Sequence, residues 1–302
     1  LLGSIVLNPR QLPWFVVWVL GMLTIALTLQ ETITIRTAGA AAVQFVMCVI
    51  VLATAFRRSR LGVAGFTGES MFVDLRDRLL RQGRMPSLPE GWHVESELRS
   101  ASGTRFAGDF VVATYLEDDE RLELVVVDVS GKGDQAGTRA LQLSGAFGGL
   151  LGSVGPEMFL ASANDYLLRQ DWVEGFATAV HLSLLLDTGE YEVRSAGHPP
   201  AVLRAAGSGR WSVLDSTGAV LGLLPAAEFT TARGRLERGD SLLLYTDGMV
   251  EEPRRDLEMG LDRLLGEAEK LLRGGVDGSA ARLVEQLGSR DDDRAVVVVH
   301  RR

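Results

Sequence analysis

The sequence predicts an α+β domain with much antiparallel sheet, preceded by a helical hairpin that crosses a membrane. Three observations predict this: two uncharged apolar runs near the N-terminus, a series of short strand-like runs, and two helical blocks that interrupt those runs. Strands followed by pairs of helices favour a layered α+β domain over a repeating strand-helix-strand unit. We expect a membrane region over 1–60, a linker over 61–86 and a globular domain over 87–302.

The two apolar runs cover residues 12–29 and 37–56 and contain no charged side chain. Each is close to the roughly 20 residues that a helix needs to cross a bilayer. Arg10 and the arginines of 57–60 flank the runs, against Arg36 alone in the connection. The positive-inside rule therefore predicts a multi-pass plasma-membrane protein with its globular domain in the cytoplasm. The alternative is a buried helical hairpin in a soluble protein.

The chain begins at Leu1 without Met and with a further apolar stretch, so we expect more membrane sequence upstream. Residues 69–82 place Met71, Phe72 and Leu75 at helical spacing. They predict an amphipathic linker helix, which serves either as a spacer or as a contact in a homodimer.

Charge divides the chain unevenly, because residues 61–302 hold 26 Lys and Arg against 38 Asp and Glu. An acidic domain without a cluster of basic residues does not favour a nucleic-acid partner. The single Cys48 excludes an intramolecular disulfide and a zinc site built on several cysteines. Chemistry in this domain therefore depends on oxygen ligands or histidine.

Eight strands are predicted after residue 100, and Asp187-Thr188-Gly189 has the composition of a hairpin turn between two of them. Two helical blocks cover residues 135–168, with Pro156 opening the second half, and 257–287, broken near Gly274. The predicted strands cover 109–115, 122–128, 176–186, 191–195, 201–204, 230–236, 241–245 and 295–300.

Aspartates stand at the ends of four of these strands: Asp109, Asp128, Asp247 and one residue of the triplet 291–293. Carboxylates held together at a sheet rim raise one another's pKa unless a cation neutralises them. Their convergence would create a divalent-metal site. Taken singly, each has another explanation, since Asp-Gly is a turn signal and an acidic triplet is often a solvated surface.

An ordered set of short motifs resembles the type-2C (PPM-type), metal-dependent protein serine/threonine phosphatases. More narrowly, it resembles the bacterial branch that dephosphorylates anti-anti-sigma factors. The resemblance runs from about Pro86 to the C-terminus. It rests on Ala107-Gly108-Asp109-Phe110, Asp128-Val129-Ser130-Gly131-Lys132-Gly133, Ser195-Ala196-Gly197-His198-Pro199-Pro200, Leu221-Gly222, Arg238-Gly239-Asp240, Tyr245-Thr246-Asp247-Gly248 and Asp292-Asp293-Arg294.

The resemblance implies a two-sheet antiparallel β-sandwich flanked by helices, which holds two Mn²⁺ or Mg²⁺ ions. It implies that Asp128 bridges both ions, that Asp247 and Asp292 complete one site, and that Asp109 and the carbonyl of Val129 complete the other. A water between two such ions would hydrolyse phosphoserine or phosphothreonine. The implied substrate is a phosphorylated regulatory protein similar to an anti-anti-sigma factor.

Some positions depart from the family pattern, and Val112 stands where many members have a second Asp. This departure supports an alternative, in which the domain is a weak or inactive phosphatase that serves as a membrane-tethered docking module. His198 is expected to brace a turn between strands rather than to act as a general acid. Lys132 is expected either to meet the phosphate or to face solvent.

Overall fold

The computed structural model describes residues 12–30, 34–60, 83–101, 107–131, 134–170, 172, 175–251, 257–288 and 292–302. The chain divides into two units, Leu1–Leu75 and Arg76–Arg302. The predicted linker helix at 69–82 and Lys132 both lie outside the described residues, so the homodimer contact and the phosphate contact stay predictions.

The described residues of the first unit form the helices α2 (Leu12–Thr28) and α3 (Ile35–Arg60), which pack against each other. Trp14 and Trp18 on α2 are 76% and 63% exposed. Within the part of the chain that the structure describes, we find no helix with both the length and the apolar character that spanning a bilayer demands.

The second unit is built from two antiparallel sheets, as the resemblance implies. One has the strand order β1-β10-β9-β6-β7 and the other β2-β3-β4-β5-β8, and all neighbours are antiparallel. The first sheet consists of β1 (Trp92–Arg99), β10 (Arg294–Arg301), β9 (Ser241–Tyr245), β6 (Val202–Ala205) and β7 (Arg210–Val213). The second consists of β2 (Phe110–Leu116), β3 (Arg121–Val129), β4 (Ala177–Leu185), β5 (Glu190–Ala196) and β8 (Thr231–Arg235).

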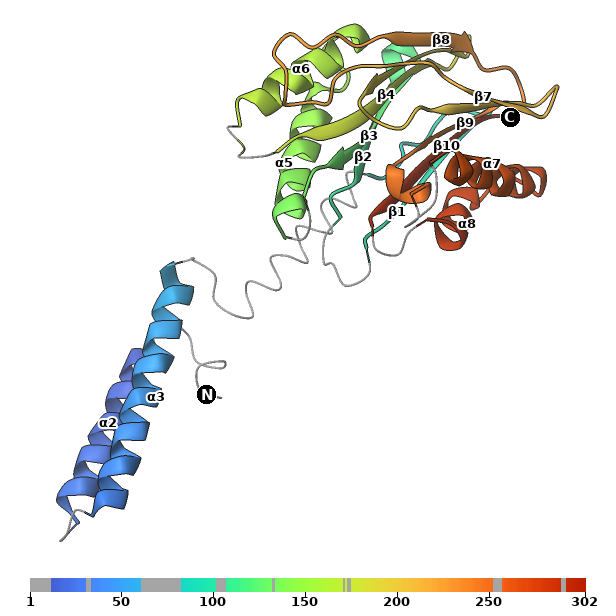
Figure 1. The fold of residues 1–302 in the computed structure, drawn as a ribbon. Helices are drawn as coiled ribbons and strands as arrows, with labels where there is room; N and C mark the ends of the chain where they lie inside the picture. The colour runs from blue at the N-terminus through green and yellow to red at the C-terminus, as the bar shows by residue number, and fades with distance from the viewer. Residues whose placement is uncertain are drawn as a thin grey trace. The chain divides into compact units, whose positions relative to one another are not determined.

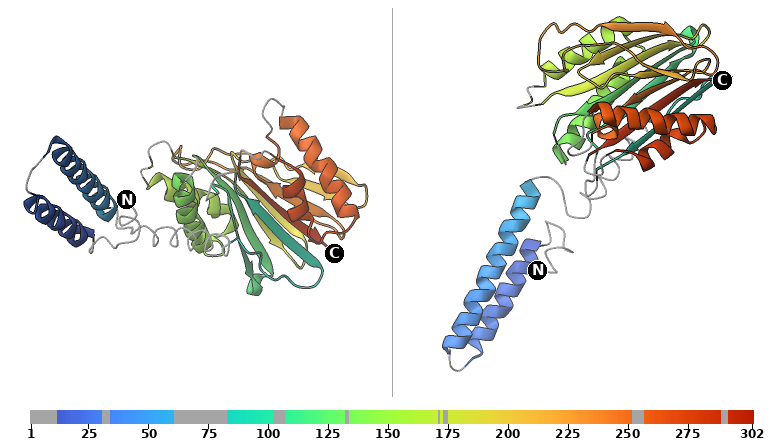
Figure 2. Two further views of the ribbon diagram at one scale, coloured as in Figure 1. Left: turned by 90° about the horizontal axis from the view of Figure 1, so that it is seen from below. Right: turned by 45° about the vertical axis from the view of Figure 1, so that its right-hand side comes forward.

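Helices cover the outer face of each sheet (Figures 1 and 2). The second sheet is covered by α5 (Asp134–Leu150) and α6 (Pro156–Leu168), and the first by α7 (Leu257–Arg273) and α8 (Ser279–Gln286). The predicted start at Pro156 is confirmed, because Pro156 is the first residue of α6 and Gly155 caps it. The predicted break near Gly274 is also confirmed, since it separates α7 from α8.

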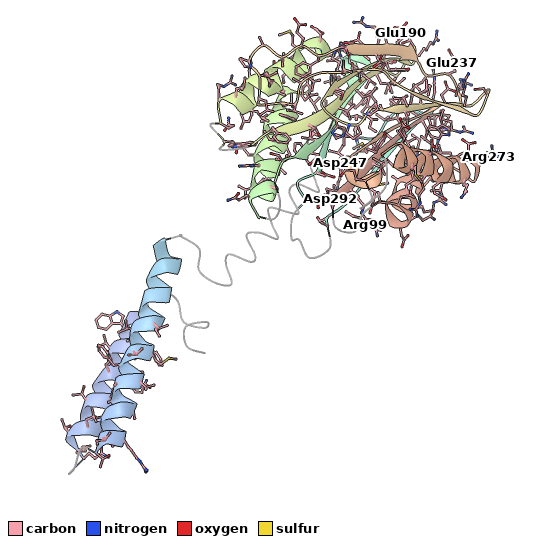
Figure 3. All side chains as sticks on the ribbon, in the orientation of Figure 1. Arg99, Glu190, Glu237, Asp247, Arg273 and Asp292 are labelled. Atoms are coloured by element: carbon pink, nitrogen blue, oxygen red, sulfur yellow. The ribbon has the colours of Figure 1, made fainter. Side chains whose placement is uncertain are left out.

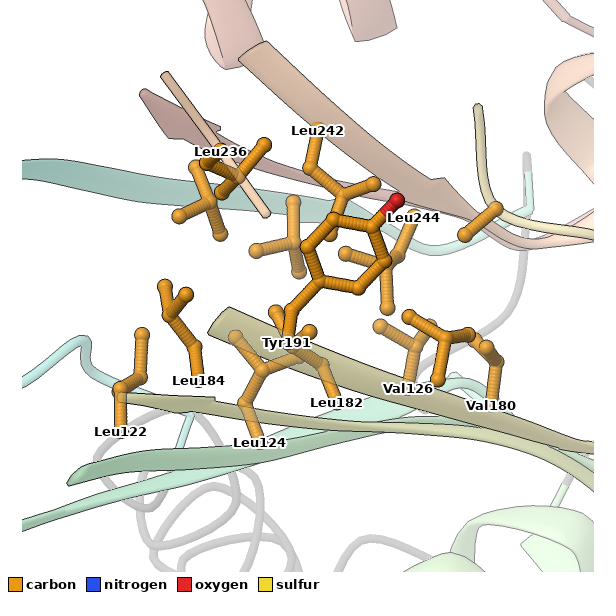
Figure 4. Close-up of a cluster of buried hydrophobic side chains, with 14 of the residues drawn as sticks. Leu122, Leu124, Val126, Val180, Leu182, Leu184, Tyr191, Leu236, Leu242 and Leu244 are labelled. Carbon is orange, nitrogen blue, oxygen red and sulfur yellow. The ribbon is translucent and has the colours of Figure 1, made fainter. Parts of the chain in front are cut away.

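The core between the sheets follows from the alternation of side chains along each strand. On β3, Leu122, Leu124 and Val126 face the other sheet, where they meet Leu242 and Leu244 of β9 (Figure 4). The intervening Val125, Val127 and Val129 face α5 and α6 instead. Burial of each Leu side chain contributes about 1.5–3 kcal/mol. From Leu124 to Val127, both faces of β3 are therefore apolar, which holds the end of the strand rigidly.

Candidate active site

Two of the predicted acids lie side by side at one end of the second sheet. Asp109 immediately precedes β2, and Asp128 is the second-last residue of β3. Phe110 pairs with Val127, so one further step of the same antiparallel register places Asp109 opposite Asp128. Asp109 is only 2% exposed. The sheet therefore fixes the positions of both carboxylates before any ligand binds.

The other two acids lie at the end of the first sheet. Asp247 opens the 3₁₀ turn η2 (Asp247–Met249), which follows β9, and Asp292 lies two residues before β10. Figure 3 shows Asp247 and Asp292 near each other at this edge of the domain, and the two carboxylates interact electrostatically. A pair of backbone-anchored bonds joins the strand ends here: Ala295 N donates to Thr246 Oγ1 at 2.9 Å, and Thr246 N donates to Ala295 O at 3.1 Å.

Gly248 is required by the close approach of these two strand ends. A Cβ on this residue would lie 1.9 Å from the carbonyl oxygen of Asp293, well inside van der Waals contact. The Asp247-Gly248 pair, which on sequence grounds could be an ordinary turn, is therefore a packing requirement beside the acids.

Two residues of the acidic triplet, Asp292 and Asp293, have different roles. Asp293 accepts a hydrogen bond from Ala101 N at 2.7 Å and another from Gly108 N at 2.5 Å. It thereby fixes the segment that carries Asp109. Asp292 remains beside Asp247, and Asp291 lies outside the described residues. Sequence reasoning missed the anchoring role of Asp293, because nothing in an acidic triplet indicates which carboxylate binds backbone.

Burial and the charges of neighbouring acids from both sheets raise the pKa values of these carboxyl groups. Burial, and then the charge of Asp128, raises the pKa of Asp109 well above its ordinary value. Burial, followed by the charges of Asp247 and Asp292, raises the pKa of Asp128 to about 7. Burial raises the pKa of Asp247, and Glu251 and Asp292 add to the shift. The four predicted acids therefore form one electrostatic cluster across both sheets.

This cluster has the chemistry of a hard-cation site. Oδ2 of Asp109 is buried and has no hydrogen-bond partner among the described residues. The carbonyl oxygen of Val129 lies 3.0 Å from the point where a Cβ on Gly108 would stand, so it is directed toward the segment that carries Asp109. All donors are oxygens, as Mg²⁺ and Mn²⁺ prefer. Across the described ranges, however, no three Asp, Glu, His or Cys side chains are already grouped as a metal-ligand set.

His198 is a brace between the sheets. Its Nε2 lies 3.0 Å from the carbonyl oxygen of Tyr245 and its Nδ1 lies 2.8 Å from the hydroxyl of Thr178. Because a carbonyl can only accept, Nε2 carries the proton and Nδ1 accepts from Thr178. Burial lowers the pKa of His198 to about 3, so the ring is neutral near pH 7. A buried, neutral ring with both nitrogens bonded agrees with the expected bracing role.

Comparison with known proteins identifies a family and a curated relative that this chain resembles. Residues 118–302 match the family model described as stage II sporulation protein E (SpoIIE). Phosphoserine phosphatase RsbU of Bacillus subtilis (strain 168) is 24% identical over 153 residues, which are 50% of this chain and 45% of RsbU. The chain therefore spans about half the length of this curated relative.

Two solved structures have the same fold. The crystal structure of the RsbU and RsbW domains of Rv1364c from Mycobacterium tuberculosis matches with a TM-score of 0.63 and 29% identity, covering 73% of this chain and 63% of that one. The catalytic domain of the serine/threonine phosphatase PstP, solved with two manganese ions, matches with a TM-score of 0.53 and 17% identity. That match covers 69% of this chain and 97% of the PstP domain, and it concerns the fold alone.

Proposed function

The chain belongs to the stage II sporulation protein E (SpoIIE) family, and from this premise we propose that it is a metal-dependent protein serine/threonine phosphatase. The observation that carries the proposal is the electrostatic cluster of Asp109, Asp128, Asp247 and Asp292, built from the ends of both sheets. Acids that raise one another's pKa are stabilised when cations neutralise them. The name of RsbU and the two manganese ions of PstP support the same chemistry.

In the proposed site, Asp128 would help to hold both divalent ions, because it interacts electrostatically with acids from both sheets. Asp247 and Asp292 would complete one ion's ligand set, and Asp109 with the carbonyl of Val129 would complete the other's. When bound, such a pair supplies a water of lowered pKa and stabilises the charge of an in-line displacement at phosphorus. The chain's own part is to hold these oxygens in place and to keep His198 neutral as a brace behind them.

The proposed substrate is a phosphorylated protein similar to an anti-anti-sigma factor. The named relative RsbU, a phosphoserine phosphatase, supports a protein phosphoserine as the target. The acidic composition of residues 61–302 does not favour a nucleic-acid ligand.

We also propose that the first unit attaches the protein to the plasma membrane, with the phosphatase unit in the cytoplasm. Large apolar side chains on α2 and α3, including Trp14, Ile35 and Phe45, are exposed to 76%, 93% and 56%. Such a surface is stabilised when it leaves water. After an alkaline carbonate wash of cell membranes, the full chain should remain in the pellet. Its release into the supernatant would contradict membrane attachment.

The second candidate function is a docking module without activity. It is suggested by Val112, which stands where many members of the family have a second Asp. In the structure Val112 is buried in the apolar cluster under α5, where its Cγ1 faces Gly148. Its side chain therefore contributes to the core under α5. A melting temperature that millimolar Mn²⁺ leaves unchanged would favour the docking module, since a ligand at one hundred times its Kd should add about 2.7 kcal/mol of stability.

The phosphatase proposal is tested with the full chain and a phosphorylated anti-anti-sigma protein. Release of phosphate should require Mn²⁺ or Mg²⁺ and stop with a chelator. Asp128→Asn and Asp247→Asn should each lower kcat by at least about 100-fold, because each replaces a negatively charged ligand of the divalent ions by a neutral amide. Asp165→Asn, at an exposed position of α6, is the matched control and should retain activity. Full activity in Asp128→Asn would remove the proposal.

A further inference from the structure

Ser130 follows the proposed ligand Val129 and has all three of its polar groups engaged. Its N–H donates to the carbonyl oxygen of Phe176 at 3.0 Å. Its hydroxyl accepts the N–H of Phe176 at 2.9 Å. Its carbonyl accepts Nη1 of Arg139 at 3.3 Å. The residue is thus fastened on one side to the chain that enters β4 and on the other to α5.

The hydroxyl takes the place of a backbone acceptor at the end of the β3–β4 ladder. Val129 pairs with Ala177 as the last rung, so Ser130 and Phe176 would form the next one. The first bond of that rung is an ordinary backbone bond, but the N–H of Phe176 bonds to the hydroxyl of Ser130 instead of its carbonyl. The carbonyl of Ser130 is thereby released from the ladder and turns to Arg139. A residue without a hydroxyl cannot make this exchange.

The same bonds determine where the carbonyl of Val129 points. The described part of the chain has no cis peptide, so the Val129 C=O and the Ser130 N–H lie on opposite sides of one planar peptide. Because the N–H is held toward Phe176, the carbonyl is held away from β4 and toward Gly108 and the acid cluster. Rotation of this peptide plane would break the bond from the Ser130 N–H to Phe176, and the hydroxyl bond holds the same two residues together beside it.

Arg139 supports the arrangement from the side of α5. Its guanidinium stacks on the ring of Trp172, 4.9 Å from the ring centre, while it donates to the carbonyl of Ser130. The guanidinium is planar and loses little freedom when it stacks and donates together. The residue after the proposed ligand is therefore fixed at its N–H, its side chain and its carbonyl.

We propose that Ser130 is a positioning residue, whose hydroxyl holds the Val129–Ser130 peptide so that the Val129 carbonyl can bind one of the two metal ions. This inference rests on the proposed function, because it assigns a role to a group that matters only when a cation is bound. It extends that function, since the four acids alone do not explain why a serine stands at this position. Groups that orient metal ligands typically change metal affinity about 10- to 100-fold when they are removed.

The test is isothermal titration of Mn²⁺ into the full chain and three variants, with the melting temperature of each metal-free protein recorded alongside. Ser130→Ala should weaken one of two Mn²⁺ binding events by about tenfold. Ser130→Thr keeps the hydroxyl and should restore the affinity. Ser208→Ala is the matched control, because the Ser208 hydroxyl also accepts a backbone N–H, from Arg210, in the turn between β6 and β7. This control should bind as the unmodified chain does.

Two outcomes would overturn the positioning role: unchanged affinity in Ser130→Ala, or equal weakening in Ser130→Ala and Ser130→Thr. Unchanged affinity together with a lowered metal-free melting temperature would describe a merely structural serine. Failure of the Ser130 proposal can be told apart from failure of the proposed function. If the proposed function fails, the unmodified chain itself will not bind Mn²⁺.

Discussion

The Nδ1 atom of His198 accepts a hydrogen bond from the hydroxyl of Thr178 at 2.8 Å. Thr178 pairs with Asp128 across β3 and β4, and the other ring nitrogen of His198 bonds to the carbonyl of Tyr245, two residues before Asp247. One imidazole therefore links the strand beside an acid of the second sheet to the strand that ends at an acid of the first.

The first prediction concerns the stability that this link provides. His198→Ala should lower the free energy of unfolding by about 3 kcal/mol, because it leaves a hydroxyl and a carbonyl without their partner in the interior. Urea denaturation of the metal-free protein measures the change. His300→Ala is the control, since His300 is half-buried and, among the side chains described, bonds to Ser241 alone. This variant should lower the free energy of unfolding by less than His198→Ala does. Equal losses in both variants would contradict the bracing role.

The second prediction concerns pH. Burial lowers the pKa of His198 in the folded state to about 3, against about 6.5 in the unfolded chain. Between these values the unfolded chain binds the extra proton, so the contribution of His198 to stability is complete above about pH 6.5 and declines as the pH falls toward 3. The difference in unfolding free energy between the unmodified chain and His198→Gln should therefore shrink from pH 7 to pH 4. A difference that is constant over this range would show that the ring is not held neutral.

The third prediction concerns Gly248. A methyl group there would meet the carbonyl oxygen of Asp293 at 1.9 Å, so Gly248→Ala must push apart the strand ends that carry Asp247 and Asp292. We expect at least about tenfold weaker Mn²⁺ binding, by titration calorimetry. Gly266→Ala is the control, because Gly266 lies within α7 with nothing near its Cβ position. The control should stabilise the protein by about 0.5–1 kcal/mol and leave Mn²⁺ binding unchanged.

The fourth prediction concerns the metal-free acids. Burial and the neighbouring carboxylates raise the pKa of Asp128 to about 7, above its ordinary 3.8. A carboxyl group with a raised folded pKa stabilises the metal-free fold below about pH 4, and this stability is lost as the pH rises through about 7. Mn²⁺ binds the ionised form, so it should raise the melting temperature more at pH 7.5 than at pH 5.5. Thermal unfolding with and without Mn²⁺ checks this. An equal shift at both values would contradict the acid cluster as the binding site.

The sequence predicted the buried strands well, because runs such as Leu124 to Val127 are apolar on both faces. It missed β1 (Trp92–Arg99) and β7 (Arg210–Val213) for a physical reason. Both are edge strands whose residues are largely half-buried or exposed, and Glu, Arg and Ser interrupt their apolar pattern. An edge strand is defined by its partner, which one sequence does not reveal.

The acids of the candidate site were proposed from the sequence, whereas the residues that support them were not. Asp109 directly precedes an apolar strand, and Asp128 and Asp247 stand at the ends of two others, a pattern that is visible in one sequence. Asp293 and Ser130 act through backbone groups of residues that are distant in the chain, such as Ala101 and Phe176. Their roles depend on the register between strands, so only the fold could reveal them.

The most direct test of the paired-metal site is the anomalous diffraction of manganese in crystals of the protein soaked with Mn²⁺. We expect two manganese peaks about 3.5–4 Å apart. Oxygens of Asp109, Asp128, Asp247, Asp292 and the Val129 carbonyl should lie within coordinating distance of one or both. Peaks at other sites only, or no peak beside Asp128, would contradict the central claim that the strand-end acids of the two sheets hold the metals.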